Sequence, residues 1–150
     1  MVPAVTVAPL GVGDRDAARA LLAGARAIEL LERSYTGTPE CVALAATQEG
    51  ALAGVVLYGA VAGAAGTGSV LWLAVRPDRR RHGIGSRLLR GALGALDADG
   101  ARLVIAELAH EPGTRPAQAL LVSNGFALEG EVADYFRDGV ALGIYRSPRR

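Results

Sequence analysis

The sequence predicts an α/β fold with a mixed, mostly antiparallel sheet of about six to seven strands, flanked by about four helices. Three patterns point to this fold class. Short apolar runs between residues 41 and 75 alternate with glycine-containing turns, as in an antiparallel meander. Apolar residues then recur at helical spacing from Ile84 to Leu96. The later run Leu103–Ala106 is continuously apolar, which is typical of a strand covered on both faces.

The first 40 residues are expected to form one strand and two helices. A short strand is predicted at Ala4–Val7. Asp14 precedes a helical run that extends to Leu22, so we expect it to act as an N-cap. A second helix is predicted at Arg26–Arg33, where apolar and charged residues fall on opposite faces, and the loop Ser34–Glu40 follows it.

The next three strands form the predicted meander. They are expected at Cys41–Thr47, Leu52–Val61 and Val70–Val75, with glycines in both of the turns between them. A helix is predicted from Gly83 to residue 98. Gly100 then ends it, because glycine commonly closes a helix.

The strand Arg102–Ala109 follows that helix directly, so we expect it to lie parallel to Val70–Val75. A helix is then predicted between Thr114, as its N-cap, and Asn124. Gln118 stands near the position that a capping partner favours.

Two strands are expected to close the fold. They are predicted at Ala127–Phe136 and Val140–Arg146, and Asp138-Gly139 between them is a strong hairpin signal. Arg149 and Arg150 are expected to form a frayed end.

A basic, glycine-containing turn joins the strand that ends at Val75 to the helix that begins at Gly83. Six arginines and a single acid, Asp78, lie between residues 76 and 90. Gly83 and Gly85 stand at the start of the helix, where free N–H groups and the helix dipole favour an anion. Glycine lets a phosphate approach this backbone closely, so the sequence predicts a phosphate-binding site here.

Two common phosphate-binding motifs do not fit this turn. A Walker loop needs a lysine, and the chain contains none. A Rossmann fingerprint needs glycine or alanine at position 88, which is leucine here. The run Val75-x-Pro77-x-x-Arg80-x-x-Gly83-Ile84-Gly85-x-x-Leu88-Leu89 instead resembles the acetyl-CoA-binding motif of the GNAT family of N-acetyltransferases. That motif often has a glycine where this chain has Arg81.

A second resemblance to this family lies near the C-terminus. The family's pattern A-x-x-L-Y-x-x-x-G-F is similar to a helix and the residues after it, with matching positions at Ala117, Leu120, Leu121, Gly125 and Phe126. With the order of the elements, the resemblance covers almost the whole chain.

The resemblance implies one GNAT (acyl-CoA N-acyltransferase) domain over residues 1–150, with acetyl-CoA as co-substrate and no metal. The implied reaction transfers acetyl to a primary amine of a small molecule or protein, by direct attack in a ternary complex. In this family, diverging parallel strands leave backbone groups free to hold the pantetheine arm. The implied cofactor-binding residues are Leu73, Ala74 and Val75 beside the pantetheine and acetyl group, and Arg80, Arg81, His82, Gly83, Ile84, Gly85 and Ser86 around the pyrophosphate.

The catalytic positions depart from the family pattern. Leu121 stands where many members have a tyrosine that protonates the leaving thiolate, and Thr114 stands where an asparagine is common. Tyr135 is the candidate acid; the alternative is a tyrosine on a sheet face with its hydroxyl in water. Glu107 and His110 are the candidate bases, because a carboxylate or an imidazole can accept the amine proton. The alternatives are a strand-end carboxylate that pairs with an arginine, and a loop histidine without a role.

The resemblance also bears on the acceptor. Segments that flank the acceptor side in this family carry five acidic residues here: Glu29, Glu32, Glu129, Glu131 and Asp134. A rim of this kind suits a cationic amine.

Composition narrows the remaining classes. Cys41 is the single cysteine, the N-terminal residues lack a signal-peptide pattern, and glycines interrupt the apolar stretch before residue 75, so we expect a cytoplasmic protein without a membrane partner. Two isolated histidines predict no metal site. The positive charge is confined to the central turn, which favours a compact anion over nucleic acid.

Two other functions stay open. The first is a catalytically degenerate domain that binds acyl-CoA as a sensor or interaction module, which the missing tyrosine favours. The second is a nucleic-acid-binding domain, whose affinity would fall steeply with salt and resist competition by free coenzyme A. Members of the family often form homodimers, and no residue pattern in this chain identifies an interface.

Overall fold

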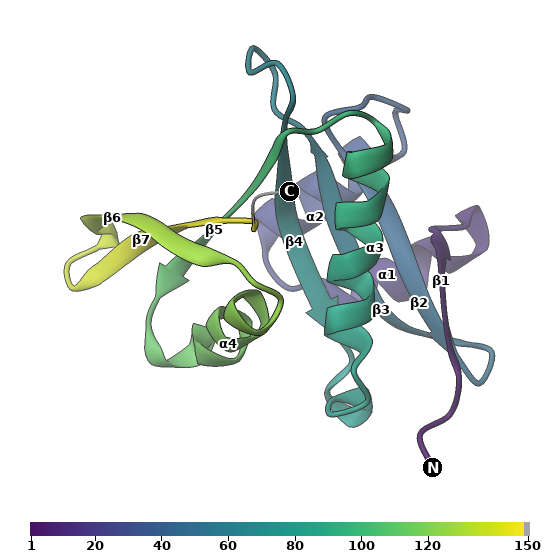
Figure 1. Cartoon of the computed structure of the whole chain (residues 1–150). Helices are drawn as coiled ribbons and strands as arrows, with labels where there is room; N and C mark the ends of the chain where they lie inside the picture. Colours follow the sequence, from purple (N-terminus) through teal and green to yellow (C-terminus); the bar gives the residue numbers. More distant parts are fainter. Residues whose placement is uncertain (149–150) are drawn as a thin grey trace.

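The computed structural model describes residues 1–148, and its sheet has seven strands in the order β1-β2-β3-β4-β5-β7-β6 (Figure 1). The strands are β1 (Val5–Pro9), β2 (Val42–Gln48), β3 (Ala51–Ala60), β4 (Thr67–Val75), β5 (Leu103–His110), β6 (Ala127–Arg137) and β7 (Val140–Arg146). The α-helices are α1 (Arg15–Leu21), α2 (Ala25–Ser34), α3 (Ile84–Ala98) and α4 (Arg115–Ser123). This confirms the predicted mixed, mostly antiparallel sheet with four helices. The expected frayed end at Arg149 and Arg150 lies outside the described residues.

Strands β4 and β5 form the one parallel pair of the described sheet. Their ladder begins at the pair Thr67–Leu103 and ends at the pair Val70–Ala106. Beyond it, β4 continues alongside β3 alone, and β5 continues to His110 alongside β7. Figure 1 shows the two strands pointing apart past this point. The predicted parallel pairing is confirmed, and we call the opening the β4–β5 fork.

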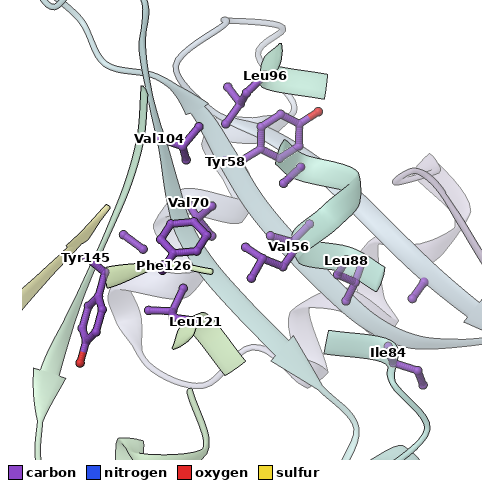
Figure 2. Packing of buried hydrophobic residues seen from close by; sticks show 14 of the residues in the cluster. Val56, Tyr58, Val70, Ile84, Leu88, Leu96, Val104, Leu121, Phe126 and Tyr145 are labelled. Carbon is purple, nitrogen blue, oxygen red and sulfur yellow. The ribbon is translucent and has the colours of Figure 1, made fainter. Parts of the chain in front are cut away.

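The helices cover the sheet from both sides. Leu88 and Leu89 of α3 and Leu121 of α4 belong to one core cluster (Figure 2). Leu30 and Leu31 of α2 belong to a second cluster on the other face. Helix α3 therefore lies against the sheet with its first turn close to the end of β4, which places the basic turn at the fork.

A β-bulge reverses the side-chain alternation in the middle of β4. Leu57 pairs with Trp72 and Tyr58 with Val70, so Leu71 is the extra residue. Val70 and Leu73 pack in the α3 cluster, whereas Trp72 packs in the α2 cluster. Without the bulge, residues 70 and 72 would share a face.

Asp14 and Thr114 occupy the expected N-cap positions of α1 and α4, but neither side chain makes a capping hydrogen bond to its helix. Asp14 ends a 3-10 turn instead, in which its N–H donates to Gly11 O at 3.1 Å. Thr114 precedes α4 in the same way, and its hydroxyl donates to Ala109 O while Gln118 donates to it at 3.0 Å. Short 3-10 turns thus begin both helices.

The β6–β7 hairpin turns at Asp138-Gly139 as predicted, with Gly139 at φ +80°. Its ladder is interrupted, because Val132 pairs with Leu142 and Arg137 with Val140. Residues 133–136 of β6 therefore bulge out opposite a single residue of β7.

No helix within residues 1–148 is both long and apolar enough to cross a membrane.

Candidate active site

The basic turn holds two residues in the left-handed region. Arg81 has φ +66° and Gly83 has φ +73°, and Gly83 is the residue that precedes α3. Glycine adopts this conformation without strain, which accounts for the glycine that the family often has at position 81. Arginine there is strained, and an alanine at position 83 would be strained as well.

The start of α3 offers unpaired donors. No side chain caps it, and Arg87 N is the first amide to bond within the helix, at 3.1 Å from Gly83 O. The N–H groups of Ile84, Gly85 and Ser86 have no acceptor within the helix. Together with the positive end of the helix dipole, they can bind a phosphate.

Two contacts fix this helix start against α4. A Cβ at Gly85 would lie 3.3 Å from Leu120 Cδ2, so glycine permits the close approach of the two helices. Asn124 Nδ2 donates to Ser86 Oγ at 3.2 Å. The Ser86 hydroxyl therefore serves the helix contact, and its N–H remains available to an anion.

A buried amide fixes the other end of the turn. Gln48, at the end of β2, is 1% exposed and is the one buried side chain among the described residues that carries an amide or a charge. Its Nε2 donates to Pro3 O at 3.1 Å and lies 3.1 Å from His82 Nδ1. Its Oε1 accepts from Arg79 Nη1 at 2.9 Å. Gln48 thus joins the N-terminal segment, the β2–β3 hairpin and the basic turn, and the His82 ring points toward it.

The fork lies beside this turn. Leu73, Ala74 and Val75 lie past the last β4–β5 pair, so β5 does not occupy their edge of β4. Leu121, at the position of the family tyrosine, is 6% exposed and packs in the core with Phe126 and Tyr145 (Figure 2). It offers no proton to the fork.

His110 is the centre of a polar network at the end of β5. Its Nδ1 contacts a carboxylate oxygen of Glu131 on β6, and its Nε2 lies 2.6 Å from the hydroxyl of Tyr145 on β7. In the neutral ring, Nδ1 donates to Glu131 and Nε2 accepts from Tyr145. Burial raises the pKa of Tyr145, and the negative charge of Glu131 raises it further. Its hydroxyl therefore stays protonated near neutral pH.

Gly143 makes room for this network. A Cβ at position 143 would lie 2.1 Å from His110 Nε2, so the imidazole packs directly over the backbone of β7. A glycine inside a strand often marks such a close approach. Gly143 was thus the one signal in the sequence for the His110 network, which joins β5, β6 and β7.

The three candidate catalytic residues lie in different places. Val104 and Ala106 face the α3 side, so strand alternation puts His110 on that side and Glu107 on the opposite one. Glu107 is exposed. Tyr135 lies in the β6 bulge, 58% exposed, with its ring against Phe136 at a centroid distance of 4.9 Å.

The acidic rim is engaged by neighbouring groups. Glu29 pairs with Arg26 and Arg33, and Glu32 pairs with Arg19. Glu129 pairs with Arg146, Glu131 contacts His110, and Asp134 accepts from Gly139 N at 2.8 Å. These contacts offset part of the negative charge that the sequence suggests.

No group of three or more potential metal ligands occurs within residues 1–148.

The family model described as "Acetyltransferase (GNAT) family" matches residues 16–126. No curated protein sequence matches the chain.

Solved structures match nearly the whole chain. A protein described as an acetyltransferase of the GNAT family, from Desulfovibrio desulfuricans, is 24% identical with a TM-score of 0.87, covering 95% of this chain and 98% of that one. The ribosomal-protein-S18-alanine N-acetyltransferase of Escherichia coli is 21% identical with a TM-score of 0.78, and the match covers 97% of this chain and 94% of that one. A chain in a structure of the NatC complex bound to Gag peptide and CoA is 17% identical with a TM-score of 0.80, and the match covers 97% of this chain and 99% of that one. At these identities the likeness shows the fold.

Proposed function

The chain belongs to the acetyltransferase (GNAT) family, and on that premise we propose that it transfers acetyl from acetyl-CoA to a primary amine of a small molecule or protein. The amine attacks the thioester directly in a ternary complex. The observation that carries the proposal is the β4–β5 fork, which opens beside the uncapped start of α3. We place the whole activity in one domain, residues 1–150, acting in the cytoplasm.

This geometry supports a specific set of cofactor contacts. The pyrophosphate binds at the N–H groups of Gly83–Ser86, beside the guanidinium groups of Arg80 and Arg81. The backbone of His82 belongs to this turn, while its ring is held by Gln48. The pantetheine and acetyl group lie along Leu73–Val75, on the edge of β4 that β5 leaves open.

Proton transfer needs a base for the amine and an acid for the thiolate. Glu107 is a base candidate, because its exposed carboxylate makes no ion pair within residues 1–148. His110 is the other, acting from the opposite side of β5. Tyr135 is the acid candidate from the sequence, and the geometry adds Tyr145, a protonated phenol held by His110. A thiolate can also leave with a proton from water, so an acid residue is not required.

The acceptor is a primary amine. The E. coli protein of similar fold acts, by its name, on an alanine of a ribosomal protein. We infer only the amine class for this chain. The partly offset acidic rim favours a cationic acceptor through its residual charge.

A second candidate is a catalytically degenerate domain that binds acyl-CoA as a sensor or interaction module. The observation that favours it is Leu121, which fills the tyrosine position with a buried aliphatic side chain. Cofactor binding is expected in both cases, and turnover separates them.

Isothermal titration with acetyl-CoA tests the shared premise. We expect a micromolar Kd that is lost in Gly83→Trp and in Arg80→Glu. Gly94→Trp is the matched control, because Gly94 lies in the same helix with open space around it and an ordinary φ. Wild-type protein that fails to bind acetyl-CoA at modest salt would overturn the assignment.

Thiol release with a panel of amines then tests catalysis. Release that depends on the amine supports the transferase. Tight binding without release for any amine class favours the sensor.

A further inference from the structure

The side chains of Glu131, His110 and Tyr145 form a row on one face of the sheet. A Cβ at Gly143 of β7 would collide with His110 Nε2, so the imidazole ring lies directly over this glycine. His110 Nδ1 contacts the Glu131 carboxylate on β6, and Nε2 lies 2.6 Å from the Tyr145 hydroxyl on β7. A carboxylate, an imidazole and a hydroxyl in this order match a catalytic triad, with a phenol in the place of serine.

The row leads from solvent toward the core. The Glu131 side chain is half exposed, the His110 side chain is mostly buried, and Tyr145 is 4% exposed. A cavity of about 300 Å³ opens beside His110, between the end of β5 and the start of α4. The network therefore borders open space next to α4, the helix whose tyrosine serves many members of the family.

Tyr145 begins at the mouth of the β4–β5 fork. It pairs with Ala106 of β5, which in turn forms the last pair with β4, at Val70. Leu73, on the part of β4 that β5 leaves open, packs in the same core cluster as Tyr145, so both lie on one side of the sheet. The Tyr145 ring extends toward His110, which ends β5, so its hydroxyl lies beside the part of β5 that β4 has left. The phenol thus belongs to the β5 side of the fork.

Acetyl transfer needs one proton removed and one delivered at this fork. After an amine attacks the thioester, its nitrogen must lose a proton, and the sulfur needs a proton as it leaves. Leu121, at the position of the family tyrosine, supplies neither, and Tyr145 packs in the same cluster (Figure 2). Burial raises the pKa of Tyr145, and the charge of Glu131 adds to this effect. A phenolate is therefore disfavoured, and the phenol must gain one proton as it gives up another.

We propose that Tyr145 and His110 carry a proton from the amine nitrogen to the leaving sulfur, with Glu131 as the positioning residue that orients the imidazole. The inference rests on the proposed function and names the groups that replace the missing family tyrosine. An ammonium acceptor must also lose a proton before it attacks, and Glu107, on the other side of β5, remains the candidate for that earlier step.

The proton balance closes within one turnover. Once the C–N bond has formed, the nitrogen proton passes to the Tyr145 oxygen while the phenol proton passes to His110 Nε2. The Glu131 carboxylate, in contact with Nδ1, stabilises the imidazolium. The electron pair on the carbonyl oxygen then re-forms the double bond, and the C–S bond breaks with its pair on sulfur. Tyr145 gives its proton to sulfur and recovers one from Nε2, so an amide and a thiol are released and the side chains are restored.

Thiol-release kinetics at saturating acceptor test the role of Tyr145. Tyr145→Phe keeps the packed ring and removes the hydroxyl, so kcat should fall about 100-fold while the KM for acetyl-CoA is unchanged. Tyr58→Phe is the matched control, because Tyr58 is equally buried in the same cluster but lies on β3, and it should keep the wild-type kcat. A wild-type kcat in Tyr145→Phe would overturn the inference and leave the proposed function standing. Wild-type protein that binds acetyl-CoA but releases no thiol with any amine would overturn both.

Glu131 and His110 need readouts of their own. Glu131→Gln should lower kcat at least about tenfold and leave the KM for acetyl-CoA and the urea midpoint unchanged, because only the orientation of the ring is lost. A lower urea midpoint with a wild-type kcat would make Glu131 structural and overturn its part. His110→Ala should lose activity and regain it about tenfold with added imidazole, which fits the space over Gly143, whereas Tyr145→Phe should not respond. Folded His110→Ala that imidazole fails to restore would overturn the shuttle.

Discussion

Replacing Gln48 with leucine tests whether its buried amide orders the basic turn between β4 and α3. The substitution keeps the side chain close in size and removes the contacts to Pro3 O, His82 Nδ1 and Arg79 Nη1. The turn then loses its attachment to β2, while its own residues stay unchanged.

The expected magnitudes follow from these contacts. Two neutral hydrogen bonds are worth about 1 kcal/mol each, and the bond from the Arg79 guanidinium about 1.5–3 kcal/mol. Burial of the leucine offsets roughly 1.5–2 kcal/mol of this loss. We therefore expect the free energy of unfolding to fall by about 2–3 kcal/mol. Ordering the released turn on binding costs about 1–2 kcal/mol, so the Kd for acetyl-CoA should rise about tenfold.

Urea unfolding and isothermal titration measure the two effects separately. Gln118→Leu is the control, because this half-buried amide makes a single hydrogen bond, to Thr114 Oγ1. It should lose about 1 kcal/mol of stability and keep its affinity for acetyl-CoA. If Gln48→Leu loses stability but binds acetyl-CoA as tightly as wild type, the amide does not order the turn and the reasoning is refuted.

Three further changes test other parts of the structure. Glu107→Gln should lower kcat at least tenfold in a thiol-release assay, with the KM for acetyl-CoA unchanged, and an unaltered kcat would remove Glu107 as base. Gly143→Ala should cost at least about 2 kcal/mol in urea unfolding and lower kcat, because the new Cβ displaces His110, whereas Gly130→Ala, with open space around it, should do neither. Burial raises the pKa of Tyr58 above its usual 10.0, so its contribution to stability is complete below about pH 10 and is lost as pH rises through the folded-state value. Tyr58→Phe should therefore flatten the alkaline fall in unfolding free energy between pH 9 and 11, and an unchanged slope would contradict this.

The order of the elements was predictable because each one carries a local pattern. The helical spacing of Ile84, Leu88 and Leu89 and the glycines that bound the strands are properties of neighbouring residues. The predicted bounds differ from the observed ones by at most three residues, and the largest difference is the start of β4, which lies at Thr67 rather than Val70.

The contacts that build the site were not predictable, because they depend on register. Gln48 and His82 are 34 positions apart, and Asn124 and Ser86 are 38 apart. The bulge at Leu71, which decides the faces of the residues after it, has no clear signal in an apolar run. One relation was available from the sequence, since strand alternation alone separates Glu107 from His110.

The bulge in β6 affects how the molecule behaves among copies of itself. Strand β6 is an edge of the sheet, and an unpaired edge can recruit another chain. Residues 133–136 interrupt its regular hydrogen-bonding row, and Glu129 and Glu131 place charge along the remainder. The opposite edge, β1, is five residues long and ends in Pro9. Both edges are thus poor templates for intermolecular sheet growth, which protects a chain that is half hydrophobic against aggregation.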